Sequence, residues 1–295
     1  IMSSLPERLF SLPFVFRGKH LYSVNLRLAV REVSLPDALA GGRSDDSSDL
    51  FVPAGVDGCL LCKVPDPGWR THTLYDDRVA YVLARDTWHY LSLAGGYDGF
   101  LENRYSAKTR ESFARDEARF AAQFGGALDL REYRSAAQLA EFAELSRALC
   151  GDAGQVDVVR AKDLGGLVGF VLFADGAPIA CLGLQSQGDT LLYVCAGERE
   201  DFRQWSAGAI VHLQAIRRLF ADPGNRYVDF RPGDCEVKRQ FANGALRSAV
   251  VLNLRRTLRN RLILSAYSLT RQLSAGREEA AVVPEAIREL LVFAG

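Results

Sequence analysis

The sequence of 295 residues has no long hydrophobic run and no excess of charge of either sign. No segment approaches the roughly 20 consecutive apolar residues of a membrane-spanning helix, so we expect no membrane span. Lys and Arg together number 36, as do Asp and Glu, and the formal net charge is therefore zero. Such a chain is not attracted to nucleic acid over its whole surface, although a local basic stripe is not excluded.

Short motifs that mark several enzyme classes are also missing. The sequence has no Gly-x-Ser-x-Gly turn, no Gly-rich phosphate loop with a Lys, and no His-Glu-x-x-His pair. Of the four histidines, His212 falls inside a predicted helix, where a histidine is more often structural than catalytic, and His89 lies in a predicted strand between Trp88 and Tyr90. These absences argue against a hydrolase, a kinase and a zinc protease.

The six cysteines do not form a recognisable metal motif. Cys59-Leu-Leu-Cys62 has ligand-like spacing, but no second pair and no histidine at zinc-finger spacing follow it. The other four are scattered and are interpreted as small hydrophobic residues, most of them buried: Cys150, Cys181, Cys195 and Cys235. We therefore predict no metal site. The first ten residues lack the features of a secretory signal, and we expect a protein of the reducing cytoplasm.

Hydrophobic periodicity predicts antiparallel strands followed by a helix and a returning strand. Two strands are expected at 78–84 and 87–93. Three further strands are expected at 167–174, 177–186 and 190–196, joined by Asp-Gly and Gly-Asp pairs that are typical of hairpin turns. Helices are expected at 135–149 and 206–221. From residue 128 the predicted order is β-α-β-β-β-α-β-α-β. This order predicts an α/β (α+β) fold with a mixed, mostly antiparallel sheet and flanking helices.

A long helix is predicted over residues 98–124, with two distinct faces. One face carries phenylalanines and is assigned to the core. The opposite face carries a basic stripe, which is either a solvated surface neutralised by neighbouring acidic residues or a surface for an anionic partner. The stripe consists of Arg104, Lys108, Arg115 and Arg119.

Two stretches carry the candidate chemistry. In Leu191–Gly208 a strand ends and a helix begins at Ser206-Ala207-Gly208, where exposed N–H groups favour a phosphate, with Arg203 adding positive charge. An ordinary capped helix is the alternative. In Asp229–Phe241 a strand ends in a Pro-Gly turn followed by Asp234, Glu236 and Lys238, which could supply a base and a cation. A helix start with early acidic and late basic residues is the alternative here.

Together these stretches resemble a known family. Trp205-Ser-Ala-Gly208 is similar to the Tyr-Ser-Pro-Gly helix start of BioF-like acetyltransferase domains, members of the GNAT, or acyl-CoA N-acyltransferase, superfamily. Asp229–Phe241 resembles the family's Asp-Phe-Gly-x-Gly-Asp-x-x-Tyr-Lys-x-x-Phe pattern. Tyr105–Arg110 resembles its Ser-x-Lys-x-Arg helix opening. The Fem-type aminoacyl-tRNA-dependent transferases share a related Phe-Lys-x-x-Phe element and contain two such modules.

The resemblance implies three parts of the chain: a degenerate GNAT-like module at 1–125 that ends in the basic helix, a complete acyltransferase module at 126–260, and a helical extension at 261–295. It also implies an acyl-CoA or another acyl thioester as co-substrate. The donor arm would lie along the strand that contains Val194 and Ala196. The phosphates would bind at Arg203, Ser206, Ala207 and Gly208, where Ser206 and Ala207 depart from the family's Gly and Pro.

Acyl transfer to an amine needs a base, donors to the tetrahedral oxyanion and an acid for the leaving thiolate. Glu236 or Asp234 would accept the amine proton. Lys238 or N–H groups near Val194–Ala196 would stabilise the oxyanion. Tyr193 or Tyr227 would protonate the thiolate.

Three functions follow from the resemblance. The first is an N-acyltransferase that moves an acyl group from acyl-CoA or an acyl-carrier protein to an amine of a small molecule or a glycan precursor. The second is a Fem-like, aminoacyl-tRNA-dependent amide-forming transferase. In either, the basic stripe would contact the donor's phosphates, a carrier protein or tRNA. The third is a GNAT-like binding protein without catalysis, since a fold does not establish activity.

Overall fold

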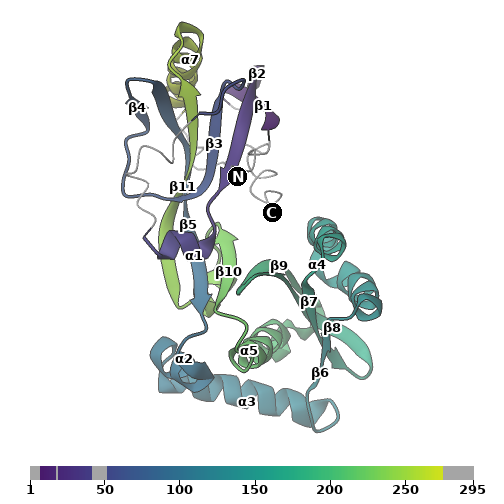
Figure 1. Cartoon of the computed structure of the whole chain (residues 1–295). Coiled ribbons are helices and arrows are strands. Elements are labelled where there is room, and N and C mark those ends of the chain that lie inside the picture. The colour runs from purple at the N-terminus through teal and green to yellow at the C-terminus, as the bar shows by residue number, and fades with distance from the viewer. Residues whose placement is uncertain (1–6, 18, 42–51, 275–295) are drawn as a thin grey trace. The chain divides into compact units, whose positions relative to one another are not determined.

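A computed structural model describes residues 7–17, 19–41 and 52–274 and has a mixed α/β fold (Figure 1). Its strands form a mostly antiparallel sheet in the order β1-β2-β3-β11-β5-β10-β9-β8-β7-β6, with β4 paired to β5. The expected fold class is therefore confirmed. The chain divides into two compact units: Ile1–Trp88 with Leu246–Gly295, and His89–Ala245. The three-part division expected from the sequence stays a prediction, and its residues 275–295 lie outside the described part of the chain.

The first unit is built mainly on strands. β1 and β2 form an antiparallel hairpin, β2 runs parallel to β3, and β3 pairs antiparallel with β11. Leu264 and Tyr267 of α7 are buried in a core with strand residues such as Leu28 and Leu252. The elements are β1 (Glu7–Phe16), β2 (Lys19–Glu32), α1 (Leu35–Leu39), β3 (Gly58–Pro65), β4 (His72–Leu74), β5 (Arg78–Ser92), β11 (Gly244–Arg255) and α7 (Leu258–Ser274).

The second unit carries the candidate chemistry. Its strands β6 to β9 pair antiparallel in succession, and β10 joins β9 in parallel. The three hairpin strands match the ranges predicted from the sequence. The elements are α2 (Gly96–Arg104), α3 (Ala107–Gln123), β6 (Asp129–Tyr133), α4 (Ala136–Leu164), β7 (Leu167–Ala174), β8 (Ala177–Gln187), β9 (Thr190–Glu198), the 3₁₀ helix η2 (Glu200–Trp205), α5 (Ala207–Phe220), β10 (Tyr227–Pro232) and α6 (Glu236–Phe241).

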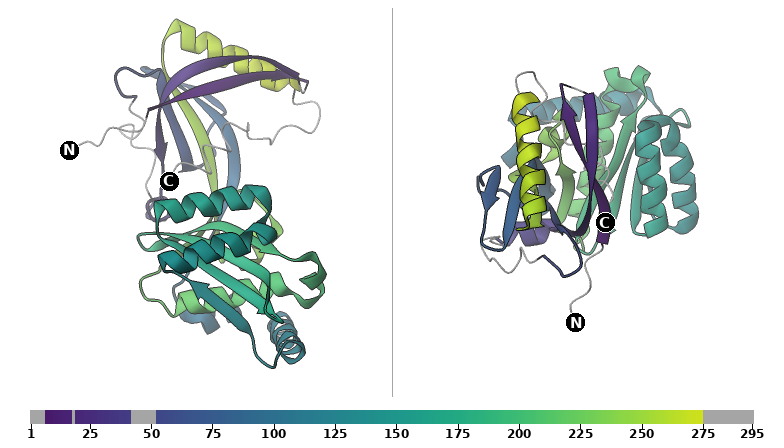
Figure 2. Two further views of the ribbon diagram at one scale, coloured as in Figure 1. Left: turned by 90° about the vertical axis from the view of Figure 1, so that its right-hand side faces the viewer. Right: turned by 90° about the horizontal axis from the view of Figure 1, so that it is seen from above.

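Helices cover both faces of the part of the sheet that lies in the second unit. The two segments of α4 lie side by side on one face, and α5 covers the other face with α3 beyond it (Figures 1 and 2). Phe142 on α4 and Ile216 on α5 are almost wholly buried, in separate hydrophobic clusters on the two faces. In the described part of the chain, no helix is both long and apolar enough to cross a membrane.

Three predicted elements are corrected. The single helix expected at 98–124 is two helices, because Ser106 begins a new one by accepting a hydrogen bond from the Thr109 N–H. The two strands expected at 78–84 and 87–93 are one continuous strand, β5. The helix that begins after Ser135 continues beyond residue 149, with a break in helical geometry at Gly151 (φ 68°, ψ 179°).

A buried histidine lies within α5. The His212 Nδ1–H donates to the Gly208 carbonyl over 2.7 Å, and the ring stacks on Phe241 with centroids 4.6 Å apart. Burial lowers the pKa of His212 from 6.5 to about 4, so the ring is neutral at physiological pH. Its Nε2 is therefore an acceptor, and the Tyr193 hydroxyl lies 3.2 Å from it.

This shift predicts a pH-dependent stability. Between pH 6.5 and about 4 the unfolded chain protonates His212 while the native ring stays neutral, so the free energy of unfolding falls as pH falls through this window. The full loss is about 3 kcal/mol. Denaturant unfolding at a series of pH values should show a shallower slope for His212→Gln than for the unmodified protein. Equal slopes in the two proteins would contradict the assignment.

Candidate active site

The candidate site begins where two neighbouring strands part. β9 and β10 pair only at Thr190–Leu192 against Tyr227–Asp229, although β9 continues to Glu198 and β10 to Pro232. On its other edge β9 stays paired with β8 as far as Glu198. Figure 1 shows the two strands diverging. Beyond Leu192, the edge of β9 that faces the gap is therefore not hydrogen-bonded to β10. Such an unpaired edge can bind the amide groups of an extended ligand.

The strand residues expected to contact a donor lie in this diverging part of β9. Val194 is buried in the cluster beneath α4, whereas Ala196 is half-buried against the cluster beneath α5. Their side chains thus pack into the two layers, and the backbone between them is what faces the gap. This arrangement fits a role in which N–H groups, rather than side chains, contact the donor.

Tyr193, expected to protonate the leaving thiolate, has its hydroxyl bonded to a residue of α5. Its hydroxyl donates to His212, and its ring packs against Phe230 of β10 with centroids 5.5 Å apart. Burial raises the pKa of Tyr193 well above its usual value. In this geometry the hydroxyl proton is directed toward α5. Proton donation to a leaving thiolate requires that hydrogen bond to break and stays a prediction.

The start of α5 already holds an anionic group. The Gly208 N–H donates to a carboxylate oxygen of Glu198 over 2.8 Å, and a Cβ at position 208 would lie 2.7 Å from that oxygen. Ser206 has a left-handed backbone (φ 57°), and its hydroxyl donates to Asp116 instead of capping the helix. Arg203 lies 3.7 Å from the Glu198 carboxylate. A carboxylate at a helix N-terminus is favourable because the N–H groups there carry partial positive charge. Glu198 therefore occupies the position expected for a donor phosphate.

Asp234 is held by two basic side chains. His89 Nε2 lies 2.9 Å from one carboxylate oxygen, and Arg239 donates to the other over 2.5 Å. These hydrogen bonds, first the one to His89, lower the pKa of Asp234 below its ordinary value. A carboxylate with a lowered pKa is a weaker base. This distinguishes Asp234 from the other candidate, Glu236, which is exposed in the first turn of α6.

Lys238 connects α6 to the end of β10. Its ammonium donates to the carbonyl oxygens of Arg231 and Pro232, each over 3.1 Å. Arg231 itself adopts a left-handed conformation (φ 61°), and its N–H donates to the buried Asp229 carboxylate over 2.6 Å. Lys238 therefore fixes the strand end from which the turn to α6 departs.

The expected basic stripe divides into two pairs. Arg104 donates to the carbonyl oxygens of Ala242 and Arg239, and Arg119 donates to the Gln204 carbonyl. Lys108 and Arg115 instead line a pocket of about 370 Å³, together with residues of α5 and with Ser206, Asp116 and Gln240. The first pair holds elements together, and the second pair faces a pocket that a ligand could enter.

One family model matches part of the chain. Residues 107–239 match the family described as "Acetyltransferase (GNAT) domain". No curated protein matches the chain in sequence.

Solved structures resemble it distantly. FemX is 11% identical with a TM-score of 0.49, covering 88% of this chain and 90% of that one. A conserved protein of unknown function from Bacteroides thetaiotaomicron is 12% identical (TM-score 0.47; 79% and 82% covered). A GCN5-related N-acetyltransferase from Kribbella flavida is 13% identical (TM-score 0.37; 85% and 89% covered). The residues that match the family model include the parting strands, the start of α5 and the turn after β10.

Proposed function

We propose that the protein is an N-acyltransferase that moves an acyl group from a thioester donor of the acyl-CoA type to an amine on a small molecule or a glycan precursor. The divergence of β9 and β10 within the GNAT-family segment is the observation that carries this proposal. Acyl transfer requires a thioester carbonyl and an amine to meet at one place, and the gap between two parting strands provides backbone donors there.

Different residues of the chain then bind the donor, stabilise the oxyanion and accept the amine proton. The donor's amide groups bind along the edge of β9 beyond Leu192, and N–H groups near Val194 and Ala196 stabilise the oxyanion. Glu236 accepts the amine proton, directly or through water, because Asp234 is already engaged by His89 and Arg239. Lys238 holds the end of β10 in place, and the turn that follows this strand leads to Glu236.

Glu198 bears on the identity of the donor. A diphosphate at the start of α5 would meet this carboxylate, and two like charges at one helix terminus repel. We infer one of two arrangements. Either Glu198 moves when a coenzyme binds, or the donor places no diphosphate at the start of α5, as with the arm of an acyl-carrier protein.

The same observation favours a second candidate, a Fem-like transferase that uses aminoacyl-tRNA. An aminoacyl ester needs no diphosphate at α5, and Lys108 and Arg115 would attract phosphates of the RNA at the pocket that they line.

Amine-dependent release of free thiol from acyl-CoA or acyl-carrier protein supports the first candidate. Amine-dependent release of uncharged tRNA, with no thiol release, supports the second. No turnover with any of the three donors would leave a protein that binds without catalysis.

Glu236→Gln tests the base. Removing the proton acceptor should lower turnover by about 10²- to 10⁴-fold while donor affinity changes little, because the substitution keeps the shape of the side chain. Steady-state kinetics with a saturating donor measures this split. Glu200→Gln is the matched control, since its exposed carboxylate lies in η2 and we assign it no role. Unchanged turnover in Glu236→Gln would remove this residue from the mechanism.

Glu198→Gln tests the donor site. Neutralising this carboxylate should strengthen the binding of coenzyme A by about 1 kcal/mol, or roughly fivefold, because the N–H groups of α5 lose a competing anion. Calorimetric titration with coenzyme A and with dephosphorylated pantetheine separates the diphosphate's contribution from that of the arm. Pantetheine affinity should stay the same. Coenzyme A binding that is equal or weaker in the variant would show that Glu198 does not obstruct a phosphate.

A further inference from the structure

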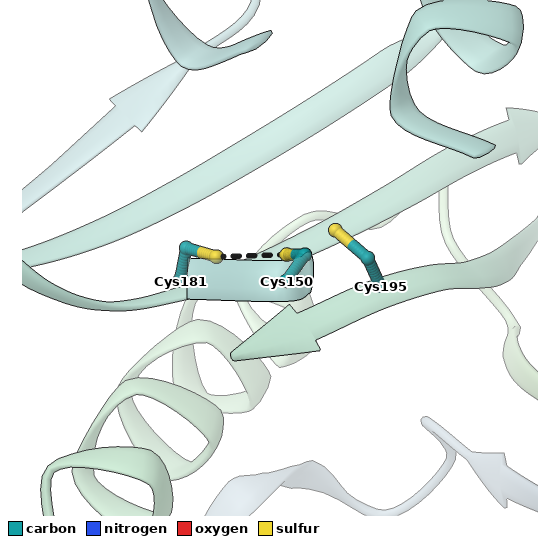
Figure 3. A group of neighbouring side chains, drawn as sticks. All are labelled: Cys150, Cys181 and Cys195. Atoms are coloured by element: carbon teal, nitrogen blue, oxygen red, sulfur yellow. Dashed lines mark hydrogen bonds between the residues drawn. The ribbon is translucent and has the colours of Figure 1, made fainter. Parts of the chain in front are cut away.

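Three cysteines that are scattered in the sequence meet in the second unit. Cys150 ends the first segment of α4, Cys181 lies on β8 and Cys195 on β9, and their sulfur atoms all lie within 4.8 Å of one another. The sulfurs of Cys150 and Cys181 are 3.3 Å apart. Figure 3 shows these two sulfurs directed at each other and the third beside them. Cys181 and Cys195 are buried, and Cys150 is partly exposed.

Glycines on the two strands make room for this cluster. In the β8–β9 register Cys181 lies opposite Gly197 and Cys195 opposite Gly183, so each cysteine faces a residue without a side chain. A Cβ at Gly197 would lie 1.8 Å from the Leu149 carbonyl oxygen and 2.9 Å from the Cys150 nitrogen. A Cβ at Gly183 would lie 3.0 Å from the Cys195 sulfur. The close approach of α4 that brings Cys150 to the strands therefore depends on Gly197.

The surroundings favour a cation. Gly151 breaks α4 immediately after Cys150, so the cluster lies at the C-terminal end of a helical segment, where the carbonyl groups give a negative potential. The neighbouring side chains, such as Phe142 and Val194, belong to an apolar cluster.

We propose that Cys150, Cys181 and Cys195 form a binding site for a thiophilic divalent cation, with Zn²⁺ as the ion whose ligand preference fits best. Zinc–thiolate bonds are about 2.3 Å long, so the sulfurs of a tetrahedral site lie about 3.8 Å apart. The three sulfurs here already lie within 4.8 Å of one another. Binding forms three Zn–S bonds, and each thiol releases its proton to solvent. Water completes the tetrahedron on the partly exposed side of Cys150. A divalent ion leaves less net charge in this apolar cluster than a monovalent ion would.

A disulfide between Cys150 and Cys181 is the competing use of the same atoms. It would need an oxidant and would leave the inward-facing Cys195 without a function. The metal site uses all three sulfurs and the room that both glycines provide. It lies on the α4 face, whereas the proposed chemistry involves the β9 edge and α5, so its test does not depend on the proposed function.

The test uses the full chain, reduced and stripped of metal by a chelator, then titrated with Zn²⁺ or with Co²⁺ as a spectroscopic probe. We expect one ion per chain, a thiolate-to-cobalt charge-transfer band, and release of the thiol protons at neutral pH. Cys150→Ser, Cys181→Ser and Cys195→Ser should each weaken binding by more than roughly tenfold, the loss that even residues behind the ligands produce. Cys235→Ser, an exposed cysteine outside the cluster, is the control and should bind as the unmodified protein does.

Gly197→Ala adds a variant that keeps every ligand. It should weaken the cobalt band by moving α4 away from β9, while circular dichroism reports whether the chain is folded. Because the titration of the unmodified protein needs no variant to fold, it decides the question by itself. The absence of a charge-transfer band there, or a Cys150–Cys181 disulfide that forms in air with Zn²⁺ present, overturns the proposal.

Discussion

The rest of the candidate site depends on the end of the pairing between β9 and β10. Only three residue pairs join these strands, whereas β8 bonds β9 along nearly its whole length. The backbone of β9 beyond Leu192 is therefore held straight on one side and directed at a gap on the other. A backbone fixed in this way presents donors without further ordering, which is the condition for stabilising charge as it develops.

Packing on the other side of the strand maintains this geometry. Tyr193 is bonded to His212, His212 is bonded to the first turn of α5, and Glu198 at the end of β9 returns to the Gly208 N–H. Two of these contacts, Tyr193 to His212 and Glu198 to Gly208, thus tie β9 to the first turns of α5. The carboxylate there stabilises the helix by the same interaction with which a donor phosphate would bind, so donor binding and local stability compete for the same N–H groups.

Local signals in the sequence were enough to predict much of the fold. The three hairpin strands follow from alternation and from Asp-Gly and Gly-Asp turns, and α5 follows from its apolar stripe. The break between α2 and α3 was missed because the helical period continues across Tyr105 and Ser106, although the resemblance of Tyr105–Arg110 to a helix opening agrees with the new helix that Ser106 caps. The stripe of basic residues was seen, but its division was not, because Arg104 and Arg119 bind carbonyl groups more than 80 residues away.

The candidate site was predicted only in part, for a related reason. Asp234, Glu236 and Lys238 lie within one turn and helix, and their proximity could be read from the sequence. Glu198 and the three cysteines could not be found this way. Glu198 reaches Gly208 across η2, and Cys150 reaches Cys181 and Cys195 because α4 folds over the sheet. Such contacts depend on which elements pack together, and a lone residue in a chain gives no signal of them.

Hydrogen exchange of the backbone amides tests the central claim most directly. Amides in residues 193–198 that β8 does not bond should exchange rapidly in the free protein and become protected when a non-hydrolysable acyl-pantetheine analogue is added. Protection should be confined to this part of β9 and the start of α5. Unchanged exchange along 193–198 under conditions where the analogue is bound would contradict the account, because the donor would then lie somewhere other than between the parted strands.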